Sequence, residues 1–234
     1  MRYNPTHEIS SKLILPVHGV TTRMAGSFQT HKSRTEYVAA LVSNLNDSDI
    51  YRVHQIHSSF VHTLDSSDTP QSVYSLDADG LVLQKRKSPT CIYITVADCI
   101  PLFLWDSNTS TCAVVHSGWK GTHENIALHA IESMVKLKSK IADIRAFIGP
   151  YIHACCYTVN ETRADVFKPT YTKSVLGVQH LDIGAVVNDQ LIELGMAIEN
   201  IDHSSLCTSC DKRFFSYRRE NADTHGTMIA YIVV

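Results

Sequence analysis

The sequence predicts an α+β fold: a single domain, residues 1–234, with mixed β-sheets flanked by helices. A chain of 234 residues lies between one large domain and two small ones, and its hydrophobic fraction of 44% is ordinary for a globular protein. The predicted helices are separated by groups of strands instead of alternating strictly with single strands, which favours α+β over a doubly wound sheet. The polar stretches 43–49 and 64–71 are expected to be loops and do not resemble domain linkers.

The expected strands are short apolar segments rich in Val, Ile, Tyr and Thr, residues that favour strands. Gly, Pro, Asp or Asn bound several of them, and Asp106-Ser107-Asn108-Thr109 has the composition of a hairpin turn. The predicted strands are Leu13–Val17, Leu81–Leu83, Cys91–Val96, Leu102–Trp105, Cys112–His116, Ile144–Ile148 and Met228–Val234.

Three helices are predicted, each with a capping residue before it. In the first, apolar residues between Ile126 and Leu137 recur on one stripe. The helices are expected at 123–140 after the N-cap Thr122, at Glu161–Phe167 between Asn160 and Pro169, and at Ile183–Leu194 between Asp182 and Gly195.

Composition restricts the classes of function. The net charge is −2 and the cations are scattered, which argues against nucleic acid as the main ligand. The first eight residues contain no apolar signal region, and no apolar run approaches the about 18 residues of a membrane helix. Seven cysteines in such a chain suggest free thiols in a reducing compartment, and thirteen histidines favour metal binding. We therefore expect a cytoplasmic enzyme with no nucleic-acid or membrane partner.

Cys99 and His116 are the leading candidates for chemistry. Each closes an apolar, β-prone stretch, where the last side chains of a strand point into a cleft. Asp98 and Pro101 require the strand to end near Cys99, and the glycines that follow His116 allow close backbone approach. A thiolate and an imidazole placed in this way are either zinc ligands or a nucleophile with its base.

His57 is the predicted third ligand. In a strand, Gln55 and His57 share a face while His54 points away, whereas in a helix His54 and His57 would share one. The β-prone flanking residues favour the strand and therefore His57. Three ligands of the Cys/His/His type leave a fourth position open, which is typical of a catalytic zinc.

The segment Cys207-Thr208-Ser209-Cys210 contains a single CxxC motif. A zinc knuckle needs a second cysteine pair, and the adjacent Cys155 and Cys156 are expected to be ill placed to chelate together. We therefore interpret Cys207 and Cys210 as loop and packing thiols.

Several charged residues lie in contexts that suggest binding or turns. Arg23 stands in a Thr/Gly/Ser-rich turn, and an arginine there can bind a phosphate or carboxylate with two hydrogen bonds. Lys120 and the pair Arg218-Arg219 are further candidates. Asp79 could support a ligand, but a role in a turn is the simpler expectation.

With these residues identified, the chain resembles the laccase-domain (YfiH-like) family, whose members are named polyphenol oxidases or purine nucleoside phosphorylases. The matching motifs occur in the same order over nearly the whole chain. They are His18-Gly19-Val20-Thr21-Thr22-Arg23, Gln55-Ile56-His57, Asp77-Ala78-Asp79-Gly80-Leu81-Val82, Thr95-Val96-Ala97-Asp98-Cys99-Ile100-Pro101, Val115-His116-Ser117-Gly118-Trp119-Lys120-Gly121-Thr122, Ile148-Gly149-Pro150, Cys155-Cys156-Tyr157 and Phe214-Phe215-Ser216-Tyr217-Arg218-Arg219.

The resemblance implies a zinc ion on His57, Cys99 and His116, and a single α+β domain. It also implies phosphorolysis of adenosine, inosine, guanosine and methylthioadenosine to the free base and (methylthio)ribose 1-phosphate, with adenosine deamination beside it. One departure concerns substrate selection: the family usually has Gly-Gly after Thr-Arg-x, whereas here Ala25 replaces the first glycine.

The leading hypothesis is a zinc-dependent purine nucleoside phosphorylase, a monomer or weak homodimer. Arg23, Cys99 and His116 are its expected catalytic residues, and Arg23, Lys120 and Arg219 are expected to bind phosphate. The alternatives are a copper-dependent polyphenol oxidase, a cysteine hydrolase acting on a cell-wall precursor, and a non-enzymatic nucleotide-binding module. Copper would also occupy a soft Cys/His site, but no two histidines have the His-x-His spacing of multicopper clusters.

Overall fold

The computed structural model describes residues 8–14, 16–28, 31–41, 49–171, 175–176, 180–220 and 225–234. Their main elements are strands β1 (Glu8–Ile9), β2 (Val17–Thr21), β3 (Ile50–Tyr51), β4 (Val61–Thr63), β5 (Gly80–Gln84), β6 (Cys91–Val96), β7 (Ile100–Asp106), β8 (Thr111–Ser117), β9 (Arg145–Ile148), β10 (Val175–Leu176), β11 (His180–Leu181), β12 (Ile201–His203) and β13 (Met228–Val233), and helices α1 (His31–Leu41), α2 (Pro70–Tyr74), α3 (Trp119–His123), α4 (Ile126–Lys136), α5 (Glu161–Tyr171) and α6 (Ile183–Glu193).

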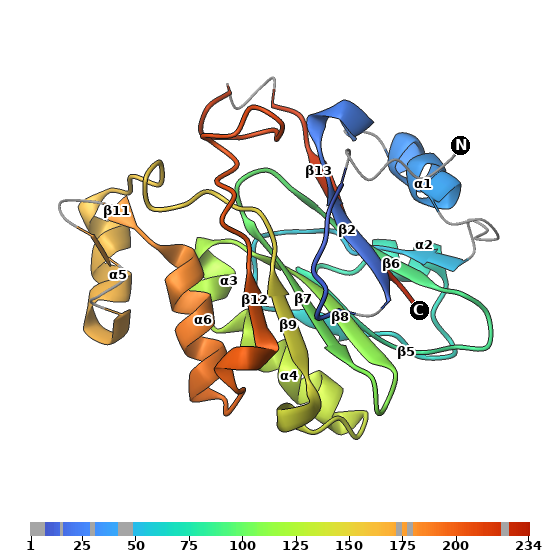
Figure 1. Cartoon of the computed structure of the whole chain (residues 1–234). Helices are drawn as coiled ribbons and strands as arrows, with labels where there is room; N and C mark the ends of the chain where they lie inside the picture. Colours follow the sequence, from blue (N-terminus) through green and yellow to red (C-terminus); the bar gives the residue numbers. More distant parts are fainter. Residues whose placement is uncertain are drawn as a thin grey trace.

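Two mixed sheets carry the fold, as the sequence predicts. One has the strand order β1-β2-β13-β6-β3 and the other the order β12-β9-β7-β8-β5-β4, while β10 and β11 form a separate pair. In the six-stranded sheet, β12 runs parallel to β9 and β4 runs parallel to β5, whereas the central strands are antiparallel. Helices α4 and α6 lie beside this sheet, and α1 lies beside the other (Figure 1).

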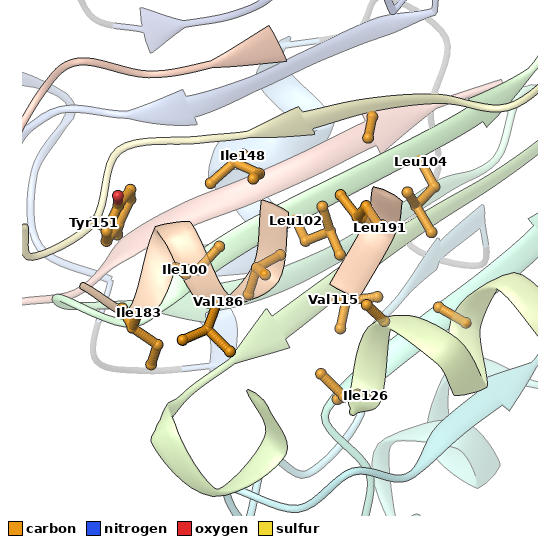
Figure 2. Packing of buried hydrophobic residues seen from close by; sticks show 14 of the residues in the cluster. Ile100, Leu102, Leu104, Val115, Ile126, Ile148, Tyr151, Ile183, Val186 and Leu191 are labelled. Carbon is orange, nitrogen blue, oxygen red and sulfur yellow. The ribbon is translucent and has the colours of Figure 1, made fainter. Parts of the chain in front are cut away.

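The central strands β7 and β8 are buried on both faces, because helices cover one face of their sheet and the five-stranded sheet covers the other. Their side chains alternate between these two faces. Leu102 and Val115 pack with the helices, whereas Phe103 and Val114 pack between the two sheets. Figure 2 shows the helix-side layer, with Ile183, Val186 and Leu191 of α6 against the strands. Two apolar layers therefore fix the ends of β7 and β8, where Cys99 and His116 stand.

The helix predicted at 123–140 is wrong as one element. The chain forms α3, breaks at Asn125 and continues as α4. Asn125 has a left-handed conformation (φ 56°), which asparagine tolerates, and its side chain accepts a hydrogen bond from the Leu128 N–H at 3.2 Å. Thr122 is therefore not the N-cap; its hydroxyl is 2.7 Å from that of Ser117.

Two further boundaries differ from the prediction. The first long strand is Val17–Thr21 instead of Leu13–Val17, because pairing with β13 begins at Val17. Pro169 does not end α5, which continues to Tyr171. The caps Asn160 and Asp182 are confirmed, since each side chain accepts a backbone N–H at 3.0 Å.

The two predicted polar loops differ in outcome. Residues 43–48 lie outside the described residues, and the second loop ends where α2 begins at Pro70. Among the described residues, no helix is long and apolar enough to cross a membrane.

Candidate metal centre

His57 lies in an irregular loop, so the strand predicted around it is wrong. Residues 52–60 form no strand beyond an isolated bridge at His54, and His57 has a left-handed backbone with φ 60°. The carboxylate of Asp79 holds this loop by accepting the backbone N–H groups of Ile56 (3.3 Å), His57 (3.0 Å) and Ser58 (2.6 Å). A buried acceptor, and not strand pairing, therefore places the imidazole.

Asp79 also orients His116, so the simple turn role expected for it is wrong. Its side chain is fully buried, and the residue directly precedes β5. Its Oδ1 is 2.7 Å from Nδ1 of His116, and its carbonyl accepts the His116 N–H at 2.6 Å. The hydrogen bond at Nδ1 leaves Nε2 as the nitrogen that can bind a metal.

Cys99 occupies the tight turn between β6 and β7, as the end of the predicted strand requires. The preceding Asp98 has φ 83°, and its buried carboxylate is held from the C-terminal part of the chain. It accepts the hydroxyl of Thr208 at 2.6 Å, the hydroxyl of Ser216 at 3.0 Å and the Arg218 N–H at 2.7 Å. These contacts fix the direction of the Cys99 side chain.

The structure brings the three predicted ligands together. The donor atoms of His57, Cys99 and His116 lie within 4.8 Å of one another, and the two imidazole rings meet edge to face at 4.8 Å between centroids. Gly118 leaves room beside them, since a Cβ there would lie 3.2 Å from the Cys99 sulfur and 3.3 Å from Cδ2 of His57. Two imidazoles and one thiolate are a suitable donor set for a catalytic metal ion.

The charges and hydrogen bonds around Cys99 favour its thiolate form. Burial acts to raise the pKa of Cys99, but the charge and hydrogen bonds of His116 and His57 outweigh it and lower the pKa to about 6. Burial acts to lower the pKa of His116, but Cys99 and Asp79 raise it to about 10. Without a metal, the site therefore holds a thiolate beside an imidazolium at neutral pH.

A cavity of about 550 Å³ opens onto the three residues. Its wall includes the aromatic side chains of Trp119, Tyr157 and Tyr217 and the guanidinium groups of Arg163 and Arg218. Aromatic walls around a few polar groups are typical of a site for a small ligand with a flat ring. The cavity therefore combines aromatic surfaces for stacking, two guanidinium groups and the three candidate metal ligands.

Of the two cations in the cavity wall, Arg163 was not selected from the sequence, whereas Arg218 was named there only as part of the Arg218-Arg219 pair. The Arg163 guanidinium lies 4.4 Å from the Trp119 ring centroid, and its buried Nε has no hydrogen-bond partner. Arg218 donates to the Cys156 carbonyl at 3.1 Å and to the Thr158 hydroxyl at 2.8 Å. No local motif marks Arg163, whereas Arg218 stands in the aromatic and basic motif 214–219.

The three cations expected to bind phosphate are placed differently. Arg23 pairs with Glu220 and lies 4.3 Å from the Phe215 ring centroid. Arg219 donates to the carbonyls of Thr208 (2.9 Å) and Ser209 (2.8 Å). Lys120 is exposed, and none of the three is among the residues that line the cavity. Their role in binding phosphate stays a prediction.

The expectation that Cys155 and Cys156 are ill placed to chelate together is wrong. The sulfur atoms of Cys155, Cys156, Cys207 and Cys210 all lie within 4.8 Å of one another. Both pairs follow strands β9 and β12, which are parallel neighbours. Parallel pairing of segments more than fifty residues apart is not visible in local spacing.

Comparisons with known proteins agree with this architecture. A model of the family described as multi-copper polyphenol oxidoreductase laccase matches residues 23–234. A Clostridium acetobutylicum protein named purine nucleoside phosphorylase is 31% identical over 208 residues, which cover 82% of this chain and 81% of that protein. A protein named adenosine deaminase, from an unidentified prokaryote, is 30% identical over 185 residues, covering 73% of this chain and 70% of that protein.

A solved structure shares the fold. The crystal structure of the hypothetical protein YfiH from Bacillus licheniformis is similar with a TM-score of 0.82 and 28% identity, covering 92% of this chain and 91% of that chain. The predicted α+β fold is thereby confirmed.

Proposed function

Because the chain belongs to the family described as multi-copper polyphenol oxidoreductase laccase, we propose that it is a zinc-dependent purine nucleoside phosphorylase of that family. Its substrates would be adenosine, inosine, guanosine and methylthioadenosine, cleaved with phosphate to the base and (methylthio)ribose 1-phosphate. Adenosine deamination would accompany this activity. The observation that carries the proposal is the cavity, in which aromatic walls and two guanidinium groups lie beside the His/Cys/His group.

The residues of the chain suggest how phosphorolysis would proceed. The bond between C1′ and the base nitrogen breaks as a phosphate oxygen bonds to C1′, so both reactants must be held in line. Trp119, Tyr157 and Tyr217 offer surfaces for the purine, and Arg163 offers a buried donor for the phosphate. His57, Cys99 and His116 would hold zinc, which supplies Lewis-acid polarisation and, for deamination, activation of water.

The proposal is tested by incubating zinc-loaded protein with each nucleoside, with and without phosphate, and detecting the products by mass spectrometry. We expect free base and ribose 1-phosphate only when phosphate is present, and inosine from adenosine in both conditions. If no nucleoside is consumed, the proposal fails and a binding module becomes the better reading.

Arg163 provides a prediction about phosphate. Replacing it by glutamine should raise the KM for phosphate roughly 10- to 100-fold, because a charge-assisted hydrogen bond to the anion is lost. The KM for the nucleoside should change much less. Steady-state kinetics with each substrate varied in turn would measure both.

Lys120→Gln is the matched control, because Lys120 is exposed and does not line the cavity. If Lys120→Gln raises the phosphate KM while Arg163→Gln does not, the phosphate site lies where the sequence predicts it instead of at Arg163.

A cysteine hydrolase is the second candidate, because the thiolate of Cys99 beside the imidazolium of His116 is also the form of a catalytic pair. In metal-free protein, alkylation of Cys99 by iodoacetamide should be half-maximal near pH 6, since the thiolate disappears as the pH falls through that pKa. An ordinary thiol would show its midpoint near pH ~8.5.

Zinc separates the two roles of Cys99. We expect zinc to block the alkylation, as measured by peptide mapping that distinguishes Cys99 from the other cysteines. A Cys99 that stays reactive in zinc-loaded protein would support the nucleophile and count against ligation.

Copper chemistry is the remaining alternative, and the description of the family model names it. Among the described residues, the groups able to hold a metal are the His/Cys/His set and the four cysteines. Neither contains the several histidines that a multicopper cluster needs. Metal analysis of protein purified without added copper separates the readings, because stoichiometric copper would favour the oxidase.

A further inference from the structure

Four cysteine side chains meet at a second place in the fold, outside the cavity. The sulfur atoms of Cys155 and Cys156 are 3.8 Å apart, and that of Cys210 lies 3.5 Å from Cys155 and 3.2 Å from Cys156. Cys207 completes the group, with all four sulfur atoms within 4.8 Å. Cys155 and Cys210 are exposed, so a metal ion from solution can reach the group.

The topology holds the two pairs in register. Strand β12 pairs with β9 so that His203 faces Ile148, and the pairing continues beyond both strands, where the Thr208 N–H donates to the Tyr151 carbonyl at 2.9 Å. An isolated bridge also joins Tyr151 to Cys207. The cysteine pairs therefore stand on two neighbouring segments that the sheet itself aligns.

We propose that Cys155, Cys156, Cys207 and Cys210 form a structural zinc site. Zinc bound to four thiolates is tetrahedral with Zn–S distances of about 2.3 Å, which places the sulfur atoms about 3.8 Å apart. The separations of 3.2, 3.5 and 3.8 Å lie close to that value. They are well beyond the about 2.05 Å of a disulfide bond, and all four cysteines are free thiols.

The surroundings of the cluster suit thiolate ligands. The Cys207 sulfur accepts the His153 N–H at 3.4 Å. The guanidinium of Arg218, bonded to the Cys156 carbonyl, adds a positive charge nearby. Backbone N–H groups and a cation stabilise the negative charge that remains on a zinc ion with four thiolates.

Four cysteine ligands indicate a structural role for this zinc. Four protein ligands leave no open position for substrate, in contrast to the three ligands of the first site. The same segments support the cavity: Thr208 bonds to Asp98 beside Cys99, and Arg218 bonds to the Cys156 carbonyl. Zinc at the cysteine cluster would therefore hold the turn of Cys99 and the wall of the cavity in place.

Metal content tests the proposal directly. Protein purified under reducing conditions with added zinc should contain two zinc ions per chain by mass spectrometry of the metal. Cys155→Ser/Cys210→Ser should contain one, and Cys99→Ala should contain one. Combining the three substitutions should leave none. The serine variants alter exposed positions, so they are expected to fold.

Spectroscopy and stability give readouts independent of nucleoside cleavage. Cobalt(II) in place of zinc should show strong thiolate charge-transfer absorption that falls sharply in Cys155→Ser/Cys210→Ser. The single variant Cys210→His should keep the second zinc, since histidine replaces cysteine in many structural sites. Losing the second zinc should lower the melting temperature by roughly 5–15 °C.

Cys91→Ala is the matched control, because Cys91 is a buried thiol of β6 outside both groups. It should keep two zinc ions. The proposal is overturned if wild-type protein holds only the zinc that Cys99→Ala removes, or if peptide mapping of reduced, zinc-supplied protein finds the four cysteines in disulfides. Either result leaves the first site and its function untouched.

Discussion

Replacing Asp79 by alanine should destabilise the protein by about 3–5 kcal/mol and weaken zinc binding at His57, Cys99 and His116 by about 10- to 100-fold. Asp79 is fully buried, and its carboxylate accepts three backbone N–H groups, the Ser58 hydroxyl and Nδ1 of His116. Removing it leaves several buried donors without an acceptor, and each carries a desolvation penalty. Denaturant unfolding and competitive zinc titration measure the two effects.

Two further substitutions test whether the Asp79 carboxylate itself organises the site. Asp79→Asn keeps the shape but turns an N–H₂ group toward donors, so it should also fail to hold the loop. Asp77→Ala is the matched control, because the Asp77 side chain is exposed and forms a surface pair with His54 at 2.8 Å. If Asp79→Asn and Asp79→Ala behave like Asp77→Ala, the carboxylate does not organise the site.

Substituting alanine for Cys99 or His116 should reduce phosphorolysis by about 10³-fold or more while the protein stays folded. Each change removes one of the three proposed metal ligands and leaves the apolar layers on both faces of β7 and β8 intact. Activity with adenosine and inosine, zinc content and circular dichroism should be measured on the same preparations.

His54→Ala is the control for these variants, since His54 lies three residues before His57 but is exposed and paired with Asp77. It should retain activity and zinc. A variant at Cys99 or His116 that loses its zinc and still cleaves nucleosides at the wild-type rate would show that the reaction does not need the metal.

Much of the fold could be predicted from the sequence because local pattern controls it. Strands β5 to β9 and β13 each lie within two residues of the predicted segments. Asn160 and Asp182 cap helices through side chains that reach only three residues ahead. The break at Asn125 was not predicted, because the apolar stripe continues through the break and only the capping geometry marks it.

Local sequence patterns could predict only some residues of the candidate site. Cys99 and His116 could be selected because each closes an apolar strand. His57 was selected for a strand that does not exist, and the left-handed loop that presents it depends on Asp79, 22 residues away. Arg163 reaches the cavity from α5 without any local signal.

The sequence by itself determined the α+β class, most strand positions and the residues able to bind a metal, because apolar alternation, capping side chains and donor chemistry are local properties. Only the tertiary structure decided which donors meet. Parallel pairing of β9 with β12 joins two cysteine pairs, and one buried carboxylate joins His57 to His116. Both depend on contacts between distant segments, whose positions are set by the packing of the whole core.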